Sequence, residues 1–86
     1  MKPVIVDVRE PSEYKTGHVK NALNIPPSDL MAGAKKLAHV DKETPLVLYC
    51  RTGSRSNVSI QILRGLGYTN LTNGINKQQV EAKYGL

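Results

Sequence analysis

A short apolar strand that runs directly into a glycine-containing loop and a helix constrains the fold of this chain most. Residues 46–49 form a continuous apolar run after Pro45, which is typical of a central strand buried on both faces. Beyond the loop, apolar residues recur at helical spacing, at Val58, Ile62, Leu63 and Leu66. Cys50, the only cysteine, therefore lies where a strand ends and a helix is about to begin, which is where open α/β sheets bind ligands.

The loop that follows Cys50 has the composition of an anion-binding site. Backbone N–H groups of a tight loop containing Gly53 can converge on one point, and the start of the next helix adds unpaired N–H groups and a positive dipole end. Arg51 and Arg55 add two positive charges. Such surroundings lower the pKa of a cysteine from ~8.5 to between ~3.5 and ~7.5. The sequence therefore predicts a thiolate nucleophile rather than an inert core cysteine.

Strands and helices alternate along the rest of the chain. Four strands are expected, at residues 4–8, 22–25, 46–49 and 68–72, with a turn at Asn73-Gly74. Four helices are expected, at residues 13–16 (capped by Ser12), from Ser28 or Asp29 to about 37, from about 54 to 65, and at residues 78–84. The alternation predicts an α/β fold, with a small, mainly parallel sheet of four to five strands, right-handed crossovers and helices on both faces.

The length and residue types restrict the class of protein. With 86 residues, the chain is expected to form one domain, residues 1–86, near the lower size limit for a self-sufficient core. Because Trp and Phe are absent, that core must be aliphatic. A single cysteine cannot form an internal disulfide, and neither His has partners at metal-ligand spacing, so we expect neither a metal nor a cofactor.

The charge pattern bears on partners and location. A net charge of +5 and a pI of 9.6 permit nucleic-acid binding, but the basic residues are scattered and have no aromatic stacking platform beside them. We therefore expect no nucleic-acid partner, and a small anionic substrate accounts for part of the charge. No signal peptide or membrane-length apolar run is visible, so we expect no membrane partner and a cytoplasmic monomer. A removed leader peptide would place the protein in the periplasm instead.

Two blocks of the sequence carry a resemblance to a known family. The first is residues 7–26, which begin Asp-Val-Arg-Glu and end Asn-Ile-Pro, and the second is residues 50–56, Cys-Arg-Thr-Gly-Ser-Arg-Ser. They resemble the N-terminal signature and the active-site loop of the rhodanese (thiosulfate sulfurtransferase) family, especially its small phage-shock-type members. Weaker agreement continues through residues 66–68 and Leu71. The resemblance spans nearly the whole chain in the right order and implies a rhodanese fold.

The resemblance also implies a mechanism. Cys50 would attack the outer sulfur of thiosulfate, release sulfite and hold the sulfur as a persulfide. Cyanide or a thiol, for example that of a thioredoxin-like protein, would then remove it. The loop residues expected to bind the sulfur and the anionic donor are Arg51, Thr52, Gly53, Ser54, Arg55 and Ser56, with Arg51 setting donor preference. An alternative of another class is a noncatalytic or sulfur-carrier module that delivers persulfide to a protein partner.

The length of the loop separates this prediction from a rival enzyme class. Related cell-cycle phosphatases and some arsenate reductases share the architecture, and their loops place five residues between cysteine and arginine. Here four residues lie between Cys50 and Arg55. The shorter loop is expected to be too tight for phosphate and suited to a single sulfur atom, so phosphatase or arsenate reductase activity is the weaker alternative.

Four polar residues near the first strand are expected to support the site rather than react. Arg9 and Glu13 are expected to form an ion pair that ties the strand to the following turn, and Asp7 to accept hydrogen bonds from the active loop. His18 is expected to be a turn residue hydrogen-bonded to backbone, since an ionised thiol needs no general base.

The resemblance also has departures. The family usually carries Gly-Gly and a Trp after the last strand, where this chain has Asn73-Gly74-Ile75-Asn76 and no Trp. The family's usual first strand and helix have no counterpart before Val4, so we expect a sheet one strand short with one edge left to cover.

Overall fold

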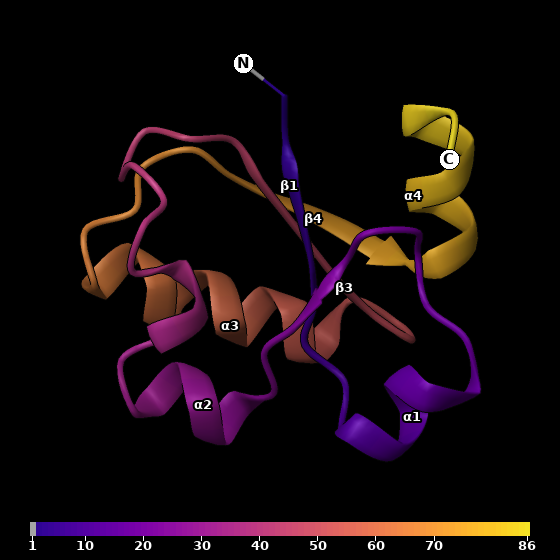
Figure 1. Ribbon diagram of the computed structural model, residues 1–86, viewed down its shortest axis with the longest axis horizontal. Helices are drawn as coiled ribbons and strands as arrows, with labels where there is room; N and C mark the ends of the chain where they lie inside the picture. The colour runs from indigo at the N-terminus through magenta and orange to yellow at the C-terminus, as the bar shows by residue number, and fades with distance from the viewer. Residues whose placement is uncertain (1) are drawn as a thin grey trace.

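The computed structural model describes residues 2–86, and its four strands form one sheet in the order β2-β1-β3-β4 (Figure 1). All three pairs of neighbouring strands are parallel. Along the chain the elements are β1 (Val4–Asp7), α1 (Pro11–Thr16), β2 (Leu23–Asn24), α2 (Pro27–Met31), the 3₁₀ helix η1 (Lys35–Leu37), β3 (Leu46–Cys50), α3 (Ser54–Gly65), β4 (Leu71–Asn76) and α4 (Lys77–Tyr84). The predicted α/β fold with a parallel sheet is confirmed.

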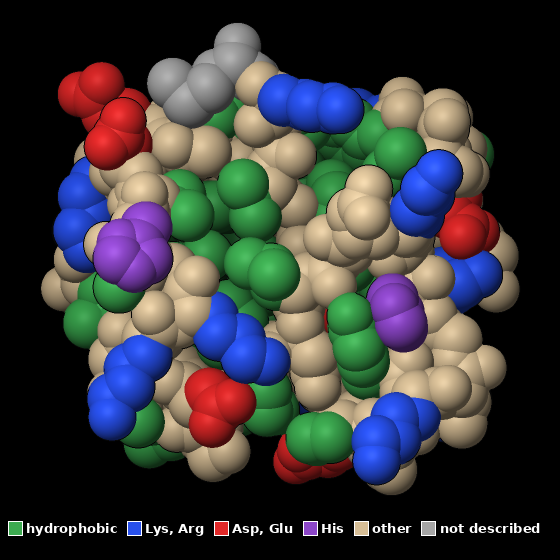
Figure 2. Space-filling view, in the orientation of Figure 1, with side chains coloured by type: hydrophobic (Ala, Val, Ile, Leu, Met, Phe, Trp, Pro, Cys, Tyr) green, Lys and Arg blue, Asp and Glu red, His purple; other side chains and the backbone are tan. Residues whose placement is uncertain are grey.

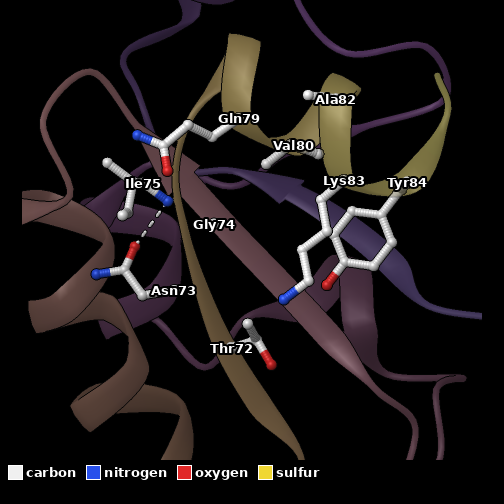
Figure 3. A pocket seen from close by; sticks show the side chains of 9 residues that line it. All are labelled: Thr72, Asn73, Gly74, Ile75, Gln79, Val80, Ala82, Lys83 and Tyr84. Carbon is white, nitrogen blue, oxygen red and sulfur yellow. Dashed lines mark hydrogen bonds between the residues drawn. The ribbon is translucent and has the colours of Figure 1, made fainter.

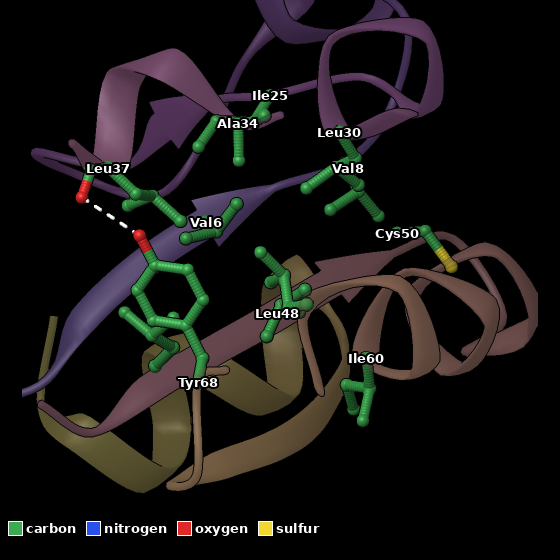
Figure 4. Packing of buried hydrophobic residues seen from close by; sticks show 12 residues of the cluster. Val6, Val8, Ile25, Leu30, Ala34, Leu37, Leu48, Cys50, Ile60 and Tyr68 are labelled. Carbon is green, nitrogen blue, oxygen red and sulfur yellow. Dashed lines mark hydrogen bonds between the residues drawn. The ribbon is translucent and has the colours of Figure 1, made fainter. Parts of the chain in front are cut away.

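The sheet separates two apolar clusters, because successive side chains of a strand point to opposite faces. On one face, under α2, η1 and α3, lies the cluster that Figure 4 shows, whose largest fully buried side chains are Val6, Val8, Ile25, Leu30, Leu37, Leu46, Leu48 and Leu63. On the other face, near α1 and α4, the buried side chains are Ile5, Val19, Ala22, Val47, Tyr49 and Val80. Helices therefore cover both faces, as predicted.

The two central strands, β1 and β3, end at the same edge of the sheet. Every residue of β3 is buried, as the continuous apolar run of residues 46–49 predicts. Asp7, the last residue of β1, pairs in register with Tyr49, and Cys50 follows as the last residue of β3. In parallel sheets this carboxyl edge is where functional groups gather. The fold thus places Cys50 beside the end of β1.

The predicted helix from Ser28 or Asp29 to residue 37 is wrong. The chain instead forms two short pieces, α2 with Pro26 at its N-cap, and η1. Between them Gly33 has φ of +108° and Ala34 has φ of +51°, and this left-handed backbone cannot continue a right-handed helix. Three apolar residues of this segment nevertheless lie in the core, namely Leu30, Ala34 and Leu37, whereas Ala38 is exposed.

The start of α1 also differs from the prediction. Ser12 lies inside the helix, Pro11 is its first residue and Glu10 is the N-cap. Pro suits that position, since its missing N–H would have no helical partner there. The Glu13 carboxylate accepts the backbone N–H of Glu10 at 3.1 Å, which is half of a capping box.

The last strand is longer than predicted and contains a β-bulge instead of a turn. The register of β4 against β3 shifts so that Leu48 faces Asn73 and Tyr49 faces Ile75, which leaves Gly74 as the extra residue. A Cβ on Gly74 would lie 2.5 Å from Val80 Cγ2, so only glycine fits. Ile75 has φ of +73°, a strained conformation for a β-branched residue. The bulge therefore shifts by one residue the pairing of the part of β4 that follows Gly74.

The face that α3 buries matches the predicted apolar stripe only in part, at Leu63, which is buried, and at Ile62, which packs against the core. Val58 is 60% exposed, and Leu66 also lies at the surface. The buried residues of α3 are Ser56, Ser59, Ile60 and Leu63. Small serines at the start of the helix let its N-terminus approach the sheet closely, and Ser59 satisfies its hydroxyl by donating to the Arg55 carbonyl at 2.7 Å.

Candidate active site

The thiol of Cys50 lies at the junction of β3 and α3. Only 2% of the residue is exposed, and the backbone N–H of Gly53 donates to its Sγ at 3.1 Å. Gly53 has φ of +93° and is the N-cap of α3, so the loop turns back on the sulfur within three residues. The helix begins immediately after it, with its unpaired N–H groups and positive dipole end near the thiol. Figure 4 shows the sulfur at the end of β3, beyond the apolar side chains.

These surroundings favour the thiolate. Burial raises the pKa of the Cys50 thiol, but the Ser56 hydroxyl and the backbone N–H groups of Ser56, Thr52 and Gly53 stabilise the charged form. Together they lower the pKa to about 7. The Ser56 Oγ lies 3.6 Å from Sγ and the residue is fully buried. At neutral pH a large fraction of Cys50 is therefore an ionised nucleophile.

This pKa predicts the pH dependence of thiol reactivity. Alkylation of Cys50 by iodoacetamide is expected to reach half of its plateau rate near pH 7, because only the thiolate reacts. Below that pH the rate should fall about tenfold per unit as the thiol becomes protonated. The alkylation rate is measured from pH 5 to 9 on the folded protein and on the urea-unfolded chain, and the midpoints of the two pH profiles are compared. A midpoint in the folded protein that is no lower than in the unfolded chain would contradict the lowered pKa of Cys50.

The thiol opens into a cavity of about 290 Å³ with a cationic lining. The lining residues are Arg9, Cys50, Arg51, Asn76, Lys77 and Gln78. Three of these side chains carry positive charge, so the cavity attracts anions toward the sulfur. Arg51 is exposed and also lines a neighbouring hollow beside α1. The cavity therefore offers a small anionic donor a positively charged lining and a nucleophile, the Cys50 thiolate.

Two other surface features carry less chemistry. A hollow of about 480 Å³ between β4 and α4 is lined by residues of those two elements and not by Cys50 (Figure 3). On the face drawn in Figure 2, Lys and Arg side chains are spread over the surface rather than gathered into one patch. Within residues 2–86, no three His, Cys, Asp or Glu side chains are grouped so that they could hold a metal ion.

Arg55 makes an ion pair that the sequence did not predict. Its guanidinium donates two hydrogen bonds to the carboxylate of Glu13, at 2.6 Å and 3.0 Å, and so joins the active loop to α1. The predicted pair between Arg9 and Glu13 is wrong, because Glu13 faces Arg55 instead. The hydrogen bonds from Arg55 lower the pKa of Glu13 to about 2. Because Glu13 occupies its guanidinium, Arg55 positions the loop, and it is not one of the residues that line the thiol cavity.

Replacing Glu13 with glutamine tests this pair. At neutral pH we expect Glu13→Gln to lower the free energy of unfolding by at most ~1 kcal/mol, since both side chains are about a third exposed and solvent screens them. The carboxylate's lowered pKa makes its contribution present above pH about 4.5 and lost as the pH falls toward 2. The difference between wild type and variant in urea unfolding should therefore vanish at low pH. A difference that grows on acidification would contradict the assignment.

Asp7, Arg9 and Tyr49 form a buried cluster under the loop. The Asp7 carboxylate is fully buried and accepts the Arg9 guanidinium at 2.8–3.1 Å, the Arg9 backbone N–H at 2.9 Å and the Tyr49 hydroxyl at 2.8 Å. Arg9 also donates to the carbonyl of Gly17 at 2.7 Å. The prediction that Asp7 accepts from the active loop is wrong, because all of these donors lie outside the loop. The cluster fixes the guanidinium of Arg9 at the wall of the Cys50 cavity.

His18 lies away from the thiol cavity. Its Nδ1 is 2.8 Å from the carbonyl oxygen of Tyr14, and its ring stacks on the Tyr14 ring with centroids 3.6 Å apart. It thus occupies the backbone-bonded turn position that the sequence indicates. Within the loop, Thr52 and Ser54 are exposed and their hydroxyls bond to each other at 3.3 Å, whereas Gly53 and Ser56 are buried.

Four residues of the site were not predicted from the sequence. They come from β4 and the start of α4 and are Asn73, Asn76, Lys77 and Gln78, of which the last three line the thiol cavity. Asn76 caps α4 by accepting the Gln79 backbone N–H at 2.9 Å. The sequence did contain a signal for these residues, because the Asn73-Gly74-Ile75-Asn76 segment departs from the family pattern. The segment is far from Cys50 along the chain, however, so the sequence did not indicate that the two lie close together in space.

Known proteins match both the sequence and the fold. The family described as Rhodanese-like domain matches residues 1–79. The thiosulfate sulfurtransferase PspE of Escherichia coli is 35% identical over 68 residues, which are 79% of this chain and 64% of PspE. A solved structure described as rhodanese with anions, from E. coli, is 30% identical, with a TM-score of 0.79 over 91% of each chain. The human single-domain sulfurtransferase TSTD1 is 32% identical, with a TM-score of 0.75 over 92% of this chain and 81% of that one.

The match to curated relatives is partial in length. Two further relatives match 84% and 81% of this chain, but the matched part is only 55% and 56% of their own length. Among residues 2–86 there is also no helix with the length and apolar character needed to cross a membrane.

Proposed function

This chain belongs to the family of rhodanese-like domains, and from this premise we propose that it is a sulfurtransferase that carries sulfur on Cys50 as a persulfide. The observation that supports this role most is the Gly53 N–H aimed at the Cys50 sulfur, at the base of a cavity lined by cations. That arrangement stabilises negative charge on sulfur, first as thiolate and then as persulfide. Sulfur transfer of some kind is also the activity for which the related proteins PspE and TSTD1 are named.

The proposed cycle has two displacement steps. The Cys50 thiolate attacks the outer sulfur of thiosulfate, the S–S bond of thiosulfate breaks, and sulfite leaves with the bonding electron pair. The carbon of cyanide, or the sulfur of a thiolate, then attacks the outer sulfur of the Cys50 persulfide. The persulfide S–S bond breaks, thiocyanate or a new persulfide leaves, and the Cys50 thiolate is restored. No proton is needed at the sulfur in either step, so the cycle requires no general base at Cys50.

Each wall of the cavity has a part in the proposed cycle. Arg51 and Lys77, at the entrance, bind the anionic oxygens of the donor, and Arg9 adds charge from a position fixed by Asp7. The backbone N–H groups at the start of α3 hold the persulfide. Of the two arginines of the loop, Arg51 is the exposed one and has the freedom to adapt to different donors.

The geometry favours sulfur transfer over phosphate chemistry. The related phosphatases place five residues between cysteine and arginine, which is enough for the loop to wrap a tetrahedral phosphate. Here Arg55 is held by both oxygens of Glu13, and Gly53 closes directly on the thiol. These contacts support the transfer of a single sulfur atom rather than the binding of phosphate within the loop.

The second candidate is a sulfur carrier that delivers persulfide to a protein partner, since carrier and enzyme use the same thiol. Acceptor preference separates the two. Thiocyanate formation from thiosulfate and cyanide, measured at saturating donor, is compared with sulfur transfer to a dithiol protein of the thioredoxin type. Efficient turnover with cyanide supports a sulfurtransferase, whereas sulfur transfer to the dithiol protein alone supports a sulfur carrier. Hydrolysis of an aryl phosphate, with no sulfur transfer to either acceptor, would overturn the proposal.

A further inference from the structure

The side chain of Asn73, on β4, reaches across to the loop that holds the thiol. Its Oδ1 accepts the Ser56 hydroxyl at 2.7 Å, and its Nδ2 donates to the Gly53 carbonyl at 3.0 Å. Oδ1 also accepts the backbone N–H of Ile75 at 3.0 Å, a bond that Figure 3 shows folding the side chain back along its own strand. Asn73 thus contacts the same two residues, Gly53 and Ser56, that contact the Cys50 sulfur.

The orientation of this amide is determined by its neighbours. The Ile75 N–H can only donate, so the group facing it must be the oxygen. The Gly53 carbonyl can only accept, so the group facing it must be the NH₂. The bulge at Gly74 brings the Ile75 N–H to this position. Asn73 therefore presents a fixed acceptor to the Ser56 hydroxyl.

The Ser56 hydroxyl has one proton and three acceptors around it. Asn73 Oδ1 lies at 2.7 Å, the Gly53 carbonyl oxygen at 3.2 Å and the Cys50 sulfur at 3.6 Å. A hydroxyl can donate only one strong hydrogen bond, so these acceptors compete. The shortest contact is to Asn73.

We infer that Asn73 is a positioning residue for Cys50, because its Oδ1 competes with the Cys50 sulfur for the single proton of Ser56. The amide oxygen is favoured by its shorter distance and the ionised sulfur by its charge, so removing the amide should strengthen the hydrogen bond from Ser56 to the thiolate. Asn73 thereby limits how strongly the loop stabilises the thiolate. As a statement about catalysis, this inference rests on the proposed function.

Limiting that stabilisation has a chemical purpose. A thiolate becomes a weaker nucleophile as its conjugate acid becomes stronger, and attack is fastest when the thiol pKa is close to the ambient pH. The charged groups that face the cavity are Arg9, Arg51 and Lys77, and Arg55 lies close enough for its charge to interact with that of Cys50. All four favour the thiolate. A neutral residue that withholds one hydrogen bond offsets part of their effect without adding a charge.

A double-mutant cycle on the thiol pKa tests the inference. The midpoint of the pH profile of iodoacetamide alkylation is measured for wild type, Asn73→Ala, Ser56→Ala and the double variant, with no sulfur donor present. Asn73→Ala is expected to lower the midpoint by about one pH unit, as the Ser56 hydroxyl bonds to the thiolate. Ser56→Ala is expected to raise it by less. In the Ser56→Ala background, Asn73→Ala should then produce no downward shift.

Two results of this double-mutant cycle would overturn the inferred role of Asn73. An unchanged or raised midpoint in Asn73→Ala, or an equal lowering in the Ser56→Ala background, means that Asn73 does not act through the Ser56 proton. Asn70→Ala is the control, because Asn70 precedes β4 and bonds only weakly, at 3.5 Å, to the Glu43 carbonyl. Thermal unfolding checks that each variant is folded, and Asn73→Gly replaces Asn73→Ala if the latter is not.

The alkylation profile is independent of sulfur transfer. If the double-mutant cycle gives the expected pKa shifts but Cys50 never gains sulfur, the proposed function fails, whereas the inferred effect of Asn73 on the thiol pKa is retained. If Cys50 gains sulfur but the cycle shows no coupling, the role of Asn73 fails alone.

Discussion

Replacement of Cys50 by serine is expected to reduce sulfur transfer at least about a thousandfold. The hydroxyl of serine is not ionised at neutral pH, and an oxygen in place of the sulfur cannot form the persulfide on which both steps of the cycle depend. The fold should survive, because a serine Oγ can accept the Gly53 N–H that now bonds to Cys50 Sγ. Initial rates of thiocyanate formation at several thiosulfate concentrations give the activity, and thermal unfolding gives the integrity of the fold.

A matched substitution separates loss of chemistry from general damage. Asn57, in the first turn of α3, is exposed, and Asn57→Ala should retain wild-type rates. A Cys50→Ser variant that is folded and keeps more than about a tenth of the activity would show that another group carries the sulfur.

The largest effect on stability is expected at Asp7. Asp7→Ala should lower the free energy of unfolding by ~3–5 kcal/mol, because it leaves the guanidinium of Arg9 with 11% exposure and no counter-charge. The hydroxyl of Tyr49 also loses its acceptor, although it still accepts the Val19 backbone N–H at 3.0 Å. A domain of this size has only ~5–15 kcal/mol in total, so the variant should be close to unfolding at 25 °C. Urea unfolding followed by circular dichroism measures the change.

An exposed ion pair provides the control for Asp7. Lys77 and Glu81 pair across one helical turn of α4 at 3.0 Å, and Glu81→Gln should cost no more than ~0.5 kcal/mol. If Asp7→Ala costs as little as Glu81→Gln, the buried cluster does not stabilise the fold as the structure indicates. The cluster also holds Arg9 at the cavity wall, so Asp7→Asn should weaken thiosulfate binding even where the fold persists.

The parts of the site that were predicted depend on residues close together in sequence. A continuous apolar run predicted β3, and the glycine, serines and arginines after Cys50 predicted a helix start and an anion site. Both are local properties, because the loop bends back on its own cysteine within three residues. The same reasoning explains why burial on both faces of β3 was predicted correctly.

The parts that were missed depend on which distant segments meet. The pairing of Arg55 with Glu13 joins residues 42 positions apart, and any of several carboxylates satisfies the sequence pattern equally well. The break between α2 and η1 was missed because Ala34 adopts a left-handed conformation that its residue type disfavours. The role of Asn73 depends on a bulge that shifts the register of β4 by one residue, and turn chemistry alone suggested that Asn73-Gly74 ends the strand.

The central claim is that Cys50 accepts a single sulfur atom, and the mass of the intact protein after exposure to thiosulfate tests it most directly. We expect a gain of about 32 Da, the mass of the one atom transferred in the covalent step, which cyanide removes and which Cys50→Ser does not show. Asn57→Ala should gain the same mass as wild type. An unchanged mass in the wild-type protein at high thiosulfate, under conditions in which iodoacetamide alkylates Cys50, would contradict the claim.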